Sequence, residues 1–385
     1  MNHLPEMNSL KPLLSIVVPT KNRYEYLKWL IKLFVSIASD NMELIIQDNS
    51  DNQTDIEDYI GKFNDGRIKY FYTQEPLSVV DNCDLAVDNS CGEYVSMIGD
   101  DDGFHRDIIK CAEYMKIRDI DSIIGSRAYY NWSGTSGVVF DYSAKLRLPK
   151  YSGKLEKIDC RKKLIRMLKT SNFQYLDYLP AVYNGIVSRA CLDKIKLISG
   201  SYFPGPSPDM ANSVALSVID IKHYKYDFPF SIAGKCTTSA GGLGAKHQHL
   251  SKIEDAKHLP ANTSERWQIQ IPKYWSAPTI YAQSAVDACI RMNNTDLASL
   301  FNYDCLMGCL FTSNMSVYRL GKEAGIKPKF FPFLRGAQTM FMQRFVSFVK
   351  NTLIKNNISR TRLIDNVNNI IECEEILQSA VQFDL

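Results

Sequence analysis

The stretch LLSIVVPTKNRYEYLKWLIKLFVSI, residues 13–37, decides the fold class of this chain. Its first seven residues form a β-branched apolar run that ends in proline, which is typical of a strand buried on both faces. Apolar side chains then recur at helical spacing from Tyr26 to Ile37, and Asn22 is available as the N-cap of this helix. The chain therefore begins with a strand followed by a helix.

The same alternation continues over the next hundred residues. Strand patterns lie at 42–51, 67–74, 93–102 and 121–132, separated by helical patterns at 55–63, 77–89 and 104–119. This order predicts an α/β fold with a mixed, mostly parallel sheet and helices on both faces. Ligands of such sheets bind at the carboxyl ends of the strands. Acidic side chains follow two of these ends, at Asp48 and at Asp100–Asp102.

Composition narrows the class of protein. The chain has 385 residues, of which 45% are hydrophobic and 23% charged, and its net charge is +3. These values exclude extensive disorder and a polytopic membrane protein, and they do not point to nucleic acid as a partner. The ten cysteines form no CxxC pair, and the amino terminus lacks a signal-peptide pattern. We therefore expect a folded protein of the cytoplasm, without a disulfide framework or a zinc site.

The acidic triplet Asp100–Asp102 allows two interpretations. Three adjacent carboxylates repel one another unless a cation lies among them, and Mg²⁺ or Mn²⁺ binds to few carboxylates together with substrate phosphates. Alternatively, one of these residues caps the helix that begins near His105, or Asp102-Gly103 forms a turn. The triplet alone supports both interpretations equally.

Three stretches together resemble glycosyltransferase family 2, the inverting enzymes of GT-A fold. SIVVPTKNR is similar to the opening strand of that family, and LIIQDNSD is similar to its second strand and acidic loop. NCDLAVDNSCGEYVSMIGDDD is similar to the helix that leads into the metal-binding DxD motif. The resemblance covers about the first 100 residues. It implies a Rossmann-like GT-A domain, a nucleotide-sugar donor and Mn²⁺ or Mg²⁺ as cofactor.

The resemblance also implies which residues bind the nucleoside. Pro19, Thr20 and Arg23 would line the nucleoside pocket, and Asp48 would accept hydrogen bonds from the base. Lys21 stands where an aromatic residue is common in the family.

Further residues are implied on the phosphate side of the donor. Asn82 and Asp84 lie on the helix that faces the donor in family members. Asp100 and Asp102 match the outer acids of the DxD motif and would bind the metal, with Asp101 between them near the ribose.

An inverting transfer also needs a general base within reach of the acceptor hydroxyl. Asp209, in PGPSPDMANSVAL, begins an apolar helix after a rigid loop and resembles the acidic residue that family members present to their acceptors. The family pattern is Glu-Asp, whereas this chain has Pro208-Asp209. The alternative for Asp209 is an ordinary helix N-cap. Asp177, which lies among aromatic residues, is the second candidate for the base.

Two histidines are candidates for a further metal ligand. His247 and His249 lie in the glycine-rich stretch SAGGLGAKHQHL. Many GT-A enzymes have a late histidine ligand beside a segment that closes over the donor. The resemblance therefore favours His247, with His249 as the alternative, while Lys246 could instead contact the diphosphate.

The carboxyl-terminal region is helical and basic. Residues 311–365 contain ten Lys/Arg and two Asp/Glu, an excess of 10 − 2 = +8. Apolar residues from Phe333 to Leu353 alternate with cationic ones, which is typical either of an interfacial helix on an anionic membrane or of a core helix with a basic outer face. The acidic tail, 369–385, is a candidate partner helix in a homo-oligomer.

These patterns divide the chain into an N-terminal extension (1–12), a GT-A catalytic domain (13–260) and a helical region (261–385). Within the domain, 13–130 is the nucleotide-sugar-binding half and 131–260 the acceptor-binding half. The function that the resemblance implies is metal-dependent, inverting transfer from a nucleotide-sugar, foremost a UDP-sugar, to a glycan. Its setting would be O-antigen or capsule-type polysaccharide assembly on an undecaprenyl-diphosphate-linked acceptor, peripheral to the inner face of the plasma membrane.

Two other functions fit part of the sequence. A sugar-phosphate nucleotidyltransferase also uses an α/β sheet and metal-binding acids, but it needs a glycine-rich phosphate loop after the first strand, and VVPTKNRYEY has no glycine. A non-catalytic glycan-binding protein on a degenerate GT-A fold would not need the intact acids at Asp48 and Asp100–Asp102.

Overall fold

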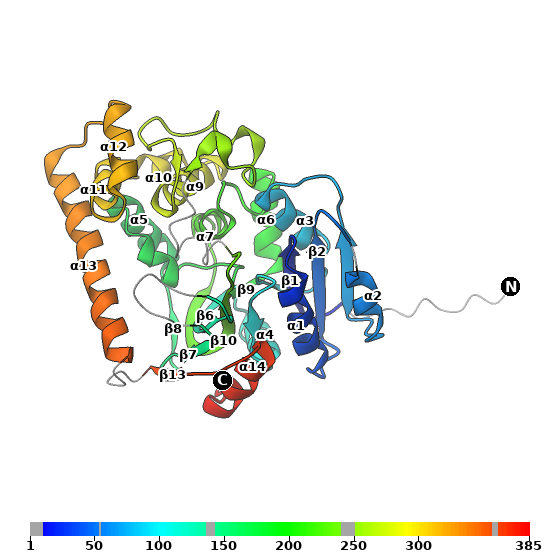
Figure 1. The fold of residues 1–385 in the computed structure, drawn as a ribbon. Helices are drawn as coiled ribbons and strands as arrows, with labels where there is room; N and C mark the ends of the chain where they lie inside the picture. Colours follow the sequence, from blue (N-terminus) through cyan, green and yellow to red (C-terminus); the bar gives the residue numbers. More distant parts are fainter. Residues whose placement is uncertain (1–10, 54, 136–142, 240–250, 356–360) are drawn as a thin grey trace.

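One large sheet forms the centre of the molecule in the computed structural model, which describes residues 11–53, 55–135, 143–239, 251–355 and 361–385 (Figure 1). The sheet has 11 strands. They are β1 (Leu14–Thr20), β2 (Met42–Asp48), β3 (Ile68–Tyr72), β4 (Tyr94–Met97), β5 (Gly103–Phe104), β6 (Ser122–Asn131), β7 (Lys145–Leu148), β8 (Leu155–Lys157), β9 (Gly185–Ser188), β10 (His223–Lys235) and β13 (Arg362–Ile364). A separate pair consists of β11 (Ser251–Lys252) and β12 (Tyr274–Trp275).

Helices cover this sheet and form a separate layer beyond it (Figure 1). They are α1 (Tyr24–Val35), α2 (Ile56–Gly61), α3 (Val79–Asp88), α4 (Ile108–Arg118), α5 (Cys160–Thr170), α6 (Arg189–Ser199), α7 (Pro208–Val218), α9 (Ala277–Arg291), α10 (Thr295–Ser299), α11 (Tyr303–Ser313), α12 (Met315–Glu323), α13 (Phe330–Lys355) and α14 (Ile370–Ala380). The fold class predicted from the sequence, a GT-A-like α/β sheet followed by a helical region, is therefore confirmed.

The strand order explains why polar residues meet at one edge of the sheet. β3, β2, β1 and β4 are neighbours and run parallel, with Thr20 opposite Asp48 and Val17 opposite Met97. Beyond β4 the sheet becomes mixed, because β9 pairs antiparallel with both β4 and β6. The carboxyl ends of β1, β2 and β4 therefore lie together, as the sequence predicted.

The start of α1 differs from the prediction. Arg23, not Asn22, is the residue that precedes the helix, and its side chain makes no capping hydrogen bond. Asn22 adopts a left-handed conformation with φ of 57°. Its side chain bonds instead to Asp51, donating to the carboxylate at 2.8 Å and accepting from the backbone N–H at 3.0 Å. Asn22 thereby ties the loop after β1 to the loop after β2, which are neighbours at the predicted site.

The carboxyl-terminal end of the described chain returns to the sheet. β13 pairs antiparallel with β7, and Ile370, Cys373 and Leu377 of α14 are buried in the same core cluster as β1 and α1. The acidic tail helix thus packs within its own chain. All ten cysteines are free, and all except Cys91 are buried. No described helix is both long and apolar enough to cross a bilayer.

Candidate functional site

Three buried carboxylates occupy the turn after β4. Asp100, Asp101 and Asp102 are each almost completely buried. A hydrogen bond of 3.2 Å from the Asp102 N–H to the Gly99 carbonyl closes the turn. Burial removes these carboxylates from water, so each needs hydrogen bonds or positive charge from the protein.

Asp100 receives both from the loop after β1. The Thr20 hydroxyl donates to its Oδ2 at 2.6 Å. Arg23 contacts both of its oxygens, with Nε 3.1 Å from Oδ2 and Nη2 2.9 Å from Oδ1. The same guanidinium lies 3.7 Å from Oδ1 of Asp101. The structure therefore brings the predicted residues Thr20, Arg23, Asp100 and Asp101 together.

Asp101 and Asp102 are held from the opposite side by the end of β10. The Cys236 N–H donates to Oδ2 of Asp101 at 3.0 Å, and the Gly234 N–H donates to Oδ1 of Asp102 at 2.7 Å. Trp132 Nε1 donates to the Asp101 carbonyl at 2.9 Å. A Cβ atom on Gly234 would lie 1.7 Å from that carbonyl oxygen. Position 234 must therefore be glycine for the two segments to approach this closely.

Asp102 also accepts hydrogen bonds from its own turn and from the segment before β9. Its Oδ2 accepts from the Gly99 N–H and from the Tyr183 hydroxyl, both at 2.8 Å. Tyr183 lies just before β9 and connects the triplet to the mixed part of the sheet.

The electrostatics of the triplet favour added positive charge. Burial, only partly offset by Arg23, raises the pKa of Asp100 to about 7. Burial and the charge of Asp101 raise the pKa of Asp102 to about 6. Burial alone would lower the pKa of Arg23, but the carboxylates of Asp100 and Asp101 outweigh it, and the pKa of Arg23 is raised. The guanidinium of Arg23 thus contacts Asp100 and Asp101, whereas Asp102 is held by neutral donors.

A divalent cation fits this charge imbalance. Arg23 Nη1 lies 3.7 Å from Asp101 Oδ1, so this oxygen is less firmly engaged than those of Asp100. In the described part of the chain, no group of three or more His, Cys, Asp or Glu side chains is arranged to hold a metal alone. Mg²⁺ commonly takes one or two protein carboxylates and completes its shell with substrate phosphates and water. The triplet can supply that share.

Asp48 is completely buried and fully engaged by its own chain. Tyr24 and Tyr70 donate their hydroxyls to Oδ2 at 2.6 and 2.8 Å. Ser50 donates its backbone N–H and its hydroxyl to Oδ1 at 2.8 and 2.6 Å. In this conformation the carboxylate fixes the loop after β2, and a base could reach it only after these bonds rearrange.

The two predicted residues of α3 have different surroundings. Asn82 lies under the β1 end, where its amide donates to the Thr20 carbonyl at 3.3 Å while its Oδ1 is buried without a hydrogen bond. Asp84 accepts the Tyr202 N–H at 2.7 Å. Burial raises the pKa of Asp84. Asn82 therefore adjoins the site, whereas Asp84 fixes the loop before α7.

Asp209 lies at the second position of α7, after Ser207 at the N-cap. It is therefore not the N-cap that the alternative interpretation required. Burial raises the pKa of Asp209, while Arg127 of β6 opposes the rise. Burial and then the charges of Asp102 and Asp209 raise the pKa of Tyr183. The Val182 N–H donates to Oδ1 of Asn212 on the same helix at 3.0 Å, so α7 lies beside the segment that carries Tyr183.

The other predicted residues lie elsewhere. Asp177 is exposed in a 3-10 helix, Phe173–Tyr178. Its neighbour Tyr178 lies under Lys163 and Lys225, whose Nζ atoms are 4.5 and 4.0 Å from the ring centroid. Lys246, His247 and His249 lie outside the described residues, so the predicted third metal ligand stays a prediction.

The structure adds residues that the sequence patterns did not single out. They are Trp132, Tyr183, Gly234 and Cys236, which hold the triplet, and Arg127, whose charge lowers the pKa of Asp209. All of them lie on β6 or β10 or next to the ends of β6, β9 and β10, where the simple strand–helix alternation ends. The single glycine in the strand pattern IAGK was a usable signal of close backbone approach.

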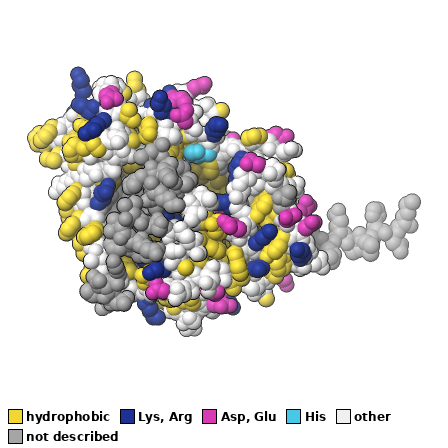
Figure 2. Space-filling view, viewed as in Figure 1, with side chains coloured by type: hydrophobic (Ala, Val, Ile, Leu, Met, Phe, Trp, Pro, Cys, Tyr) yellow, Lys and Arg dark blue, Asp and Glu magenta, His cyan; other side chains and the backbone are white. Residues whose placement is uncertain are grey.

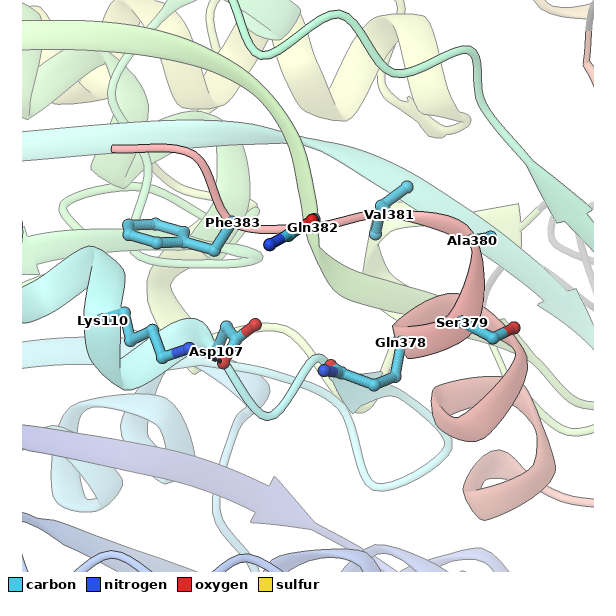
Figure 3. A pocket seen from close by; sticks show the side chains of 8 residues that line it. All are labelled: Asp107, Lys110, Gln378, Ser379, Ala380, Val381, Gln382 and Phe383. Atoms are coloured by element: carbon cyan, nitrogen blue, oxygen red, sulfur yellow. Dashed lines mark ion pairs between the residues drawn. The ribbon is translucent and has the colours of Figure 1, made fainter.

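A cavity elsewhere is separate from this site. It measures about 450 Å³ and is lined by Asp107, Lys110 and residues 378–383 at the end of α14 (Figure 3). An ion pair of 2.8 Å joins Lys110 to Asp107 at its edge. Its lining includes none of the predicted donor, metal or base residues.

Parallel strands with polar side chains at their carboxyl ends are typical of nucleotide-binding α/β folds. Residues 15–165 match the family model described as Glycosyl transferase family 2. Over this segment, which is less than half of the chain, the protein is therefore similar to glycosyltransferases of family 2.

Individual relatives are distant. The glycosyltransferase GlyG of Streptococcus pneumoniae serotype 4 is 24% identical over 136 residues, which are 34% of this chain and 44% of GlyG. The chain thus matches less than half the length of that curated relative. Similar solved structures include S. aureus TarS 1–349 in complex with UDP, with 13% identity, a TM-score of 0.46 and coverage of 87% of this chain and 92% of TarS 1–349. The mannosyltransferase PcManGT of Pyrobaculum calidifontis, solved with GDP-Man and Mn²⁺, has 11% identity, a TM-score of 0.41 and coverage of 89% and 88%.

Proposed function

We propose that the chain is a metal-dependent, inverting glycosyltransferase that moves a sugar from a nucleotide-sugar to a hydroxyl group of a glycan. The observation that carries this proposal is the position of Tyr183 between the acid triplet and α7. This residue bonds to Asp102 of the triplet, and its neighbour Val182 bonds to Asn212 of α7, the helix that begins with Asp209 at its second position. These contacts support a single site that contains both an acid cluster suited to a diphosphate and a candidate base.

Asp209 is the general base of the proposed reaction. The acceptor hydroxyl attacks the anomeric carbon from the face opposite the nucleotide and gives its proton to the Asp209 carboxylate. A pKa raised by burial makes this carboxylate a better proton acceptor than an exposed aspartate. Arg127 limits this rise in the pKa of Asp209.

The triplet and the loop after β1 serve the leaving group. As the bond to the sugar breaks, the nucleoside diphosphate gains negative charge that must be stabilised. Arg23 can turn part of its positive charge to that group, because its guanidinium is 23% exposed beside the completely buried Asp100. A divalent ion held by Asp101 and Asp102 would supply the remaining positive charge. Asp100 is engaged by Thr20 and Arg23 and would orient Arg23 rather than bind the metal.

We propose a UDP-sugar as donor and a lipid-linked glycan, such as an undecaprenyl-diphosphate-linked intermediate, as acceptor. The setting would be O-antigen or capsule-type polysaccharide assembly at the inner face of the plasma membrane. The basic region between residues 311 and 365 supports an acceptor that is presented at an anionic surface.

A ligand screen followed by turnover tests the proposal. A ligand that binds only the native state raises the melting temperature, by an amount that grows with its concentration relative to Kd. UDP-, GDP- and dTDP-sugars are compared with and without Mn²⁺. The hydrolysis of the sugar that stabilises the protein is then measured as release of its nucleotide. We expect a UDP-sugar to stabilise the protein in the presence of Mn²⁺ and to be hydrolysed, and Asp102→Asn to abolish both effects. Turnover that is undiminished in excess EDTA would refute the metal assignment.

A further inference from the structure

The inner face of α13 is firmly seated on the protein. α11 and α13 approach so closely that a Cβ atom on Gly308 would lie 2.0 Å from the Phe333 carbonyl oxygen, and one on Gly336 would lie 2.0 Å from that of Cys305. Gln343 Nε2 donates to Asn172 Oδ1 at 2.7 Å further along the helix, and Ile354 is buried near its end. α13 is thus a fixed part of the helical layer.

The outer face of the same helix is apolar. Phe331 is 81% exposed, Phe341 60%, Phe345 53% and Phe348 58%. The last three are separated by four and three residues, so they lie on one side of the helix. Other exposed apolar residues on α13 are Phe330, Leu334, Met342, Val346, Val349 and Leu353. In Figure 2, hydrophobic side chains gather along the left edge of the molecule, where α13 lies in Figure 1.

This arrangement corrects one sequence-based interpretation. Among the apolar residues expected on one side, Phe333 packs with the core cluster that includes α11, while Leu334, Phe341, Phe345 and Phe348 face outward. The helix is therefore apolar on two faces. A helix that is apolar on both faces normally has a partner on each of them.

Charge indicates which partner fits the outer face. From Lys327 to Lys355 there are six Lys/Arg and no Asp/Glu. At 100° per residue, Arg344 lies on one flank of the exposed apolar stripe and Lys350 on the other. Two such faces from two copies of the chain would repel each other. A surface that is both negatively charged and apolar beneath, as an anionic lipid leaflet is, complements both features.

We propose that the outer face of α13 is a docking surface for an anionic lipid bilayer. The phenylalanines enter the boundary between headgroups and acyl chains, and Arg335, Arg344 and Lys350 contact the anionic headgroups. With 26 residues and a rise of about 1.5 Å per residue, α13 can lie along about 39 Å of the membrane surface. This inference stands on α13 alone and does not depend on the proposed transfer reaction.

Vesicle co-sedimentation of the full chain tests the proposal. Binding is measured to phosphatidylcholine vesicles with and without 30% phosphatidylglycerol, a composition of about one anionic lipid in three. We expect binding only to the anionic vesicles and a loss of binding as salt is raised. Each basic residue near an anionic surface contributes about fivefold to binding, so R335Q/R344Q/K350Q should lower the partition coefficient about 100-fold. F341S/F345S/F348S should lower it by at least as much.

Matched control variants separate membrane binding by α13 from the general loss of exposed apolar or basic side chains. I117S/L197S/I269S removes three apolar side chains that are even more exposed than these phenylalanines and lie outside α13, and K11Q/K62Q/K194Q removes three exposed lysines. Both control variants should bind as the unaltered chain does. Nucleotide-sugar hydrolysis in vesicle-free solution should be unchanged in all four variants. Equal binding to neutral vesicles, equal losses in the controls, or a dimer that the phenylalanine variant dissociates without any vesicle binding would each overturn the proposal.

Discussion

Replacing Gly234 by alanine tests the close contact on which the acid triplet depends. The new methyl group would lie 1.7 Å from the Asp101 carbonyl oxygen and 2.5 Å from its carbon. Both are backbone atoms, so no side-chain rotation can relieve the overlap. The end of β10 must move away from the turn, and the bond of 2.7 Å from the Gly234 N–H to Asp102 is then lost.

Two contributions set how far Gly234→Ala lowers the free energy of unfolding. Displacing tightly packed backbone costs about 1–3 kcal/mol, and removing a hydrogen bond to a buried carboxylate costs about 1.5–3 kcal/mol. Their sum is about 4 kcal/mol. Unfolding entropy of about 2.1 cal/mol/K per residue gives about 0.8 kcal/mol/K for a chain of this length. We therefore expect the melting temperature to fall by about 5 °C.

The assay combines scanning calorimetry with donor binding. Gly234→Ala should lose donor stabilisation in Mn²⁺ as well as thermal stability, because the position of Asp102 changes. Gly61→Ala is the matched control, since nothing lies within 4 Å of its new methyl group at the end of α2. That variant should be neutral or more stable by up to about 1 kcal/mol. A Gly234→Ala protein with unaltered melting temperature and donor binding would refute the close approach of β10 to the triplet.

Three further predictions concern the base, the acids and the tail. Asp209→Asn should lower kcat about 10²–10⁴-fold, as loss of a general base does, while calorimetric donor affinity stays constant; a parallel loss of affinity would assign Asp209 to the donor instead. The pKa values of about 7 for Asp100 and about 6 for Asp102 lie above those of the unfolded chain, so the native state binds more protons. The contribution of these two groups to the free energy of unfolding therefore falls as pH rises from about 4 to 7. Mn²⁺ with UDP should therefore raise the melting temperature more at pH 8 than at pH 5.5, and an equal rise would contradict a metal site at the triplet. Arg106→Ala leaves the buried Glu374 carboxylate, now 2.5 Å from the guanidinium, without its ion-pair partner, which should cost about 3–5 kcal/mol; adding Glu374→Ala should recover part of the loss in a double-mutant cycle.

The first half of the fold was predictable because local pattern and tertiary role agree there. Each strand from β1 to β4 is an apolar run followed by a helical pattern, and such units have essentially one way to pack as a parallel sheet. The acids follow these strands directly, so their meeting at one edge could be read from the order of elements.

The second half of the fold depends on strand pairings between segments far apart in the sequence, and no local sequence pattern indicates these pairings. β9 has four residues and inserts antiparallel between β4 and β6, and β13 joins the sheet beside β7 after the whole helical layer. No spacing in the sequence specifies these partners. Tyr183, which precedes β9, and Gly234, near the end of β10, were missed for this reason, since their roles exist only once the mixed part of the sheet is assembled.

Contacts with residues distant in sequence make the three aspartates of the site unequal. From the sequence, three adjacent aspartates appear to be equivalent ligands that wait for a metal. In the fold, Arg23 neutralises Asp100 first, and backbone N–H groups from β10 bind Asp101 and Asp102. A backbone N–H stabilises a carboxylate without supplying a full charge, so the negative excess is left on the two residues nearest β10. On this charge balance we expect Asp101 and Asp102, rather than Asp100, to hold the cation of the proposed reaction.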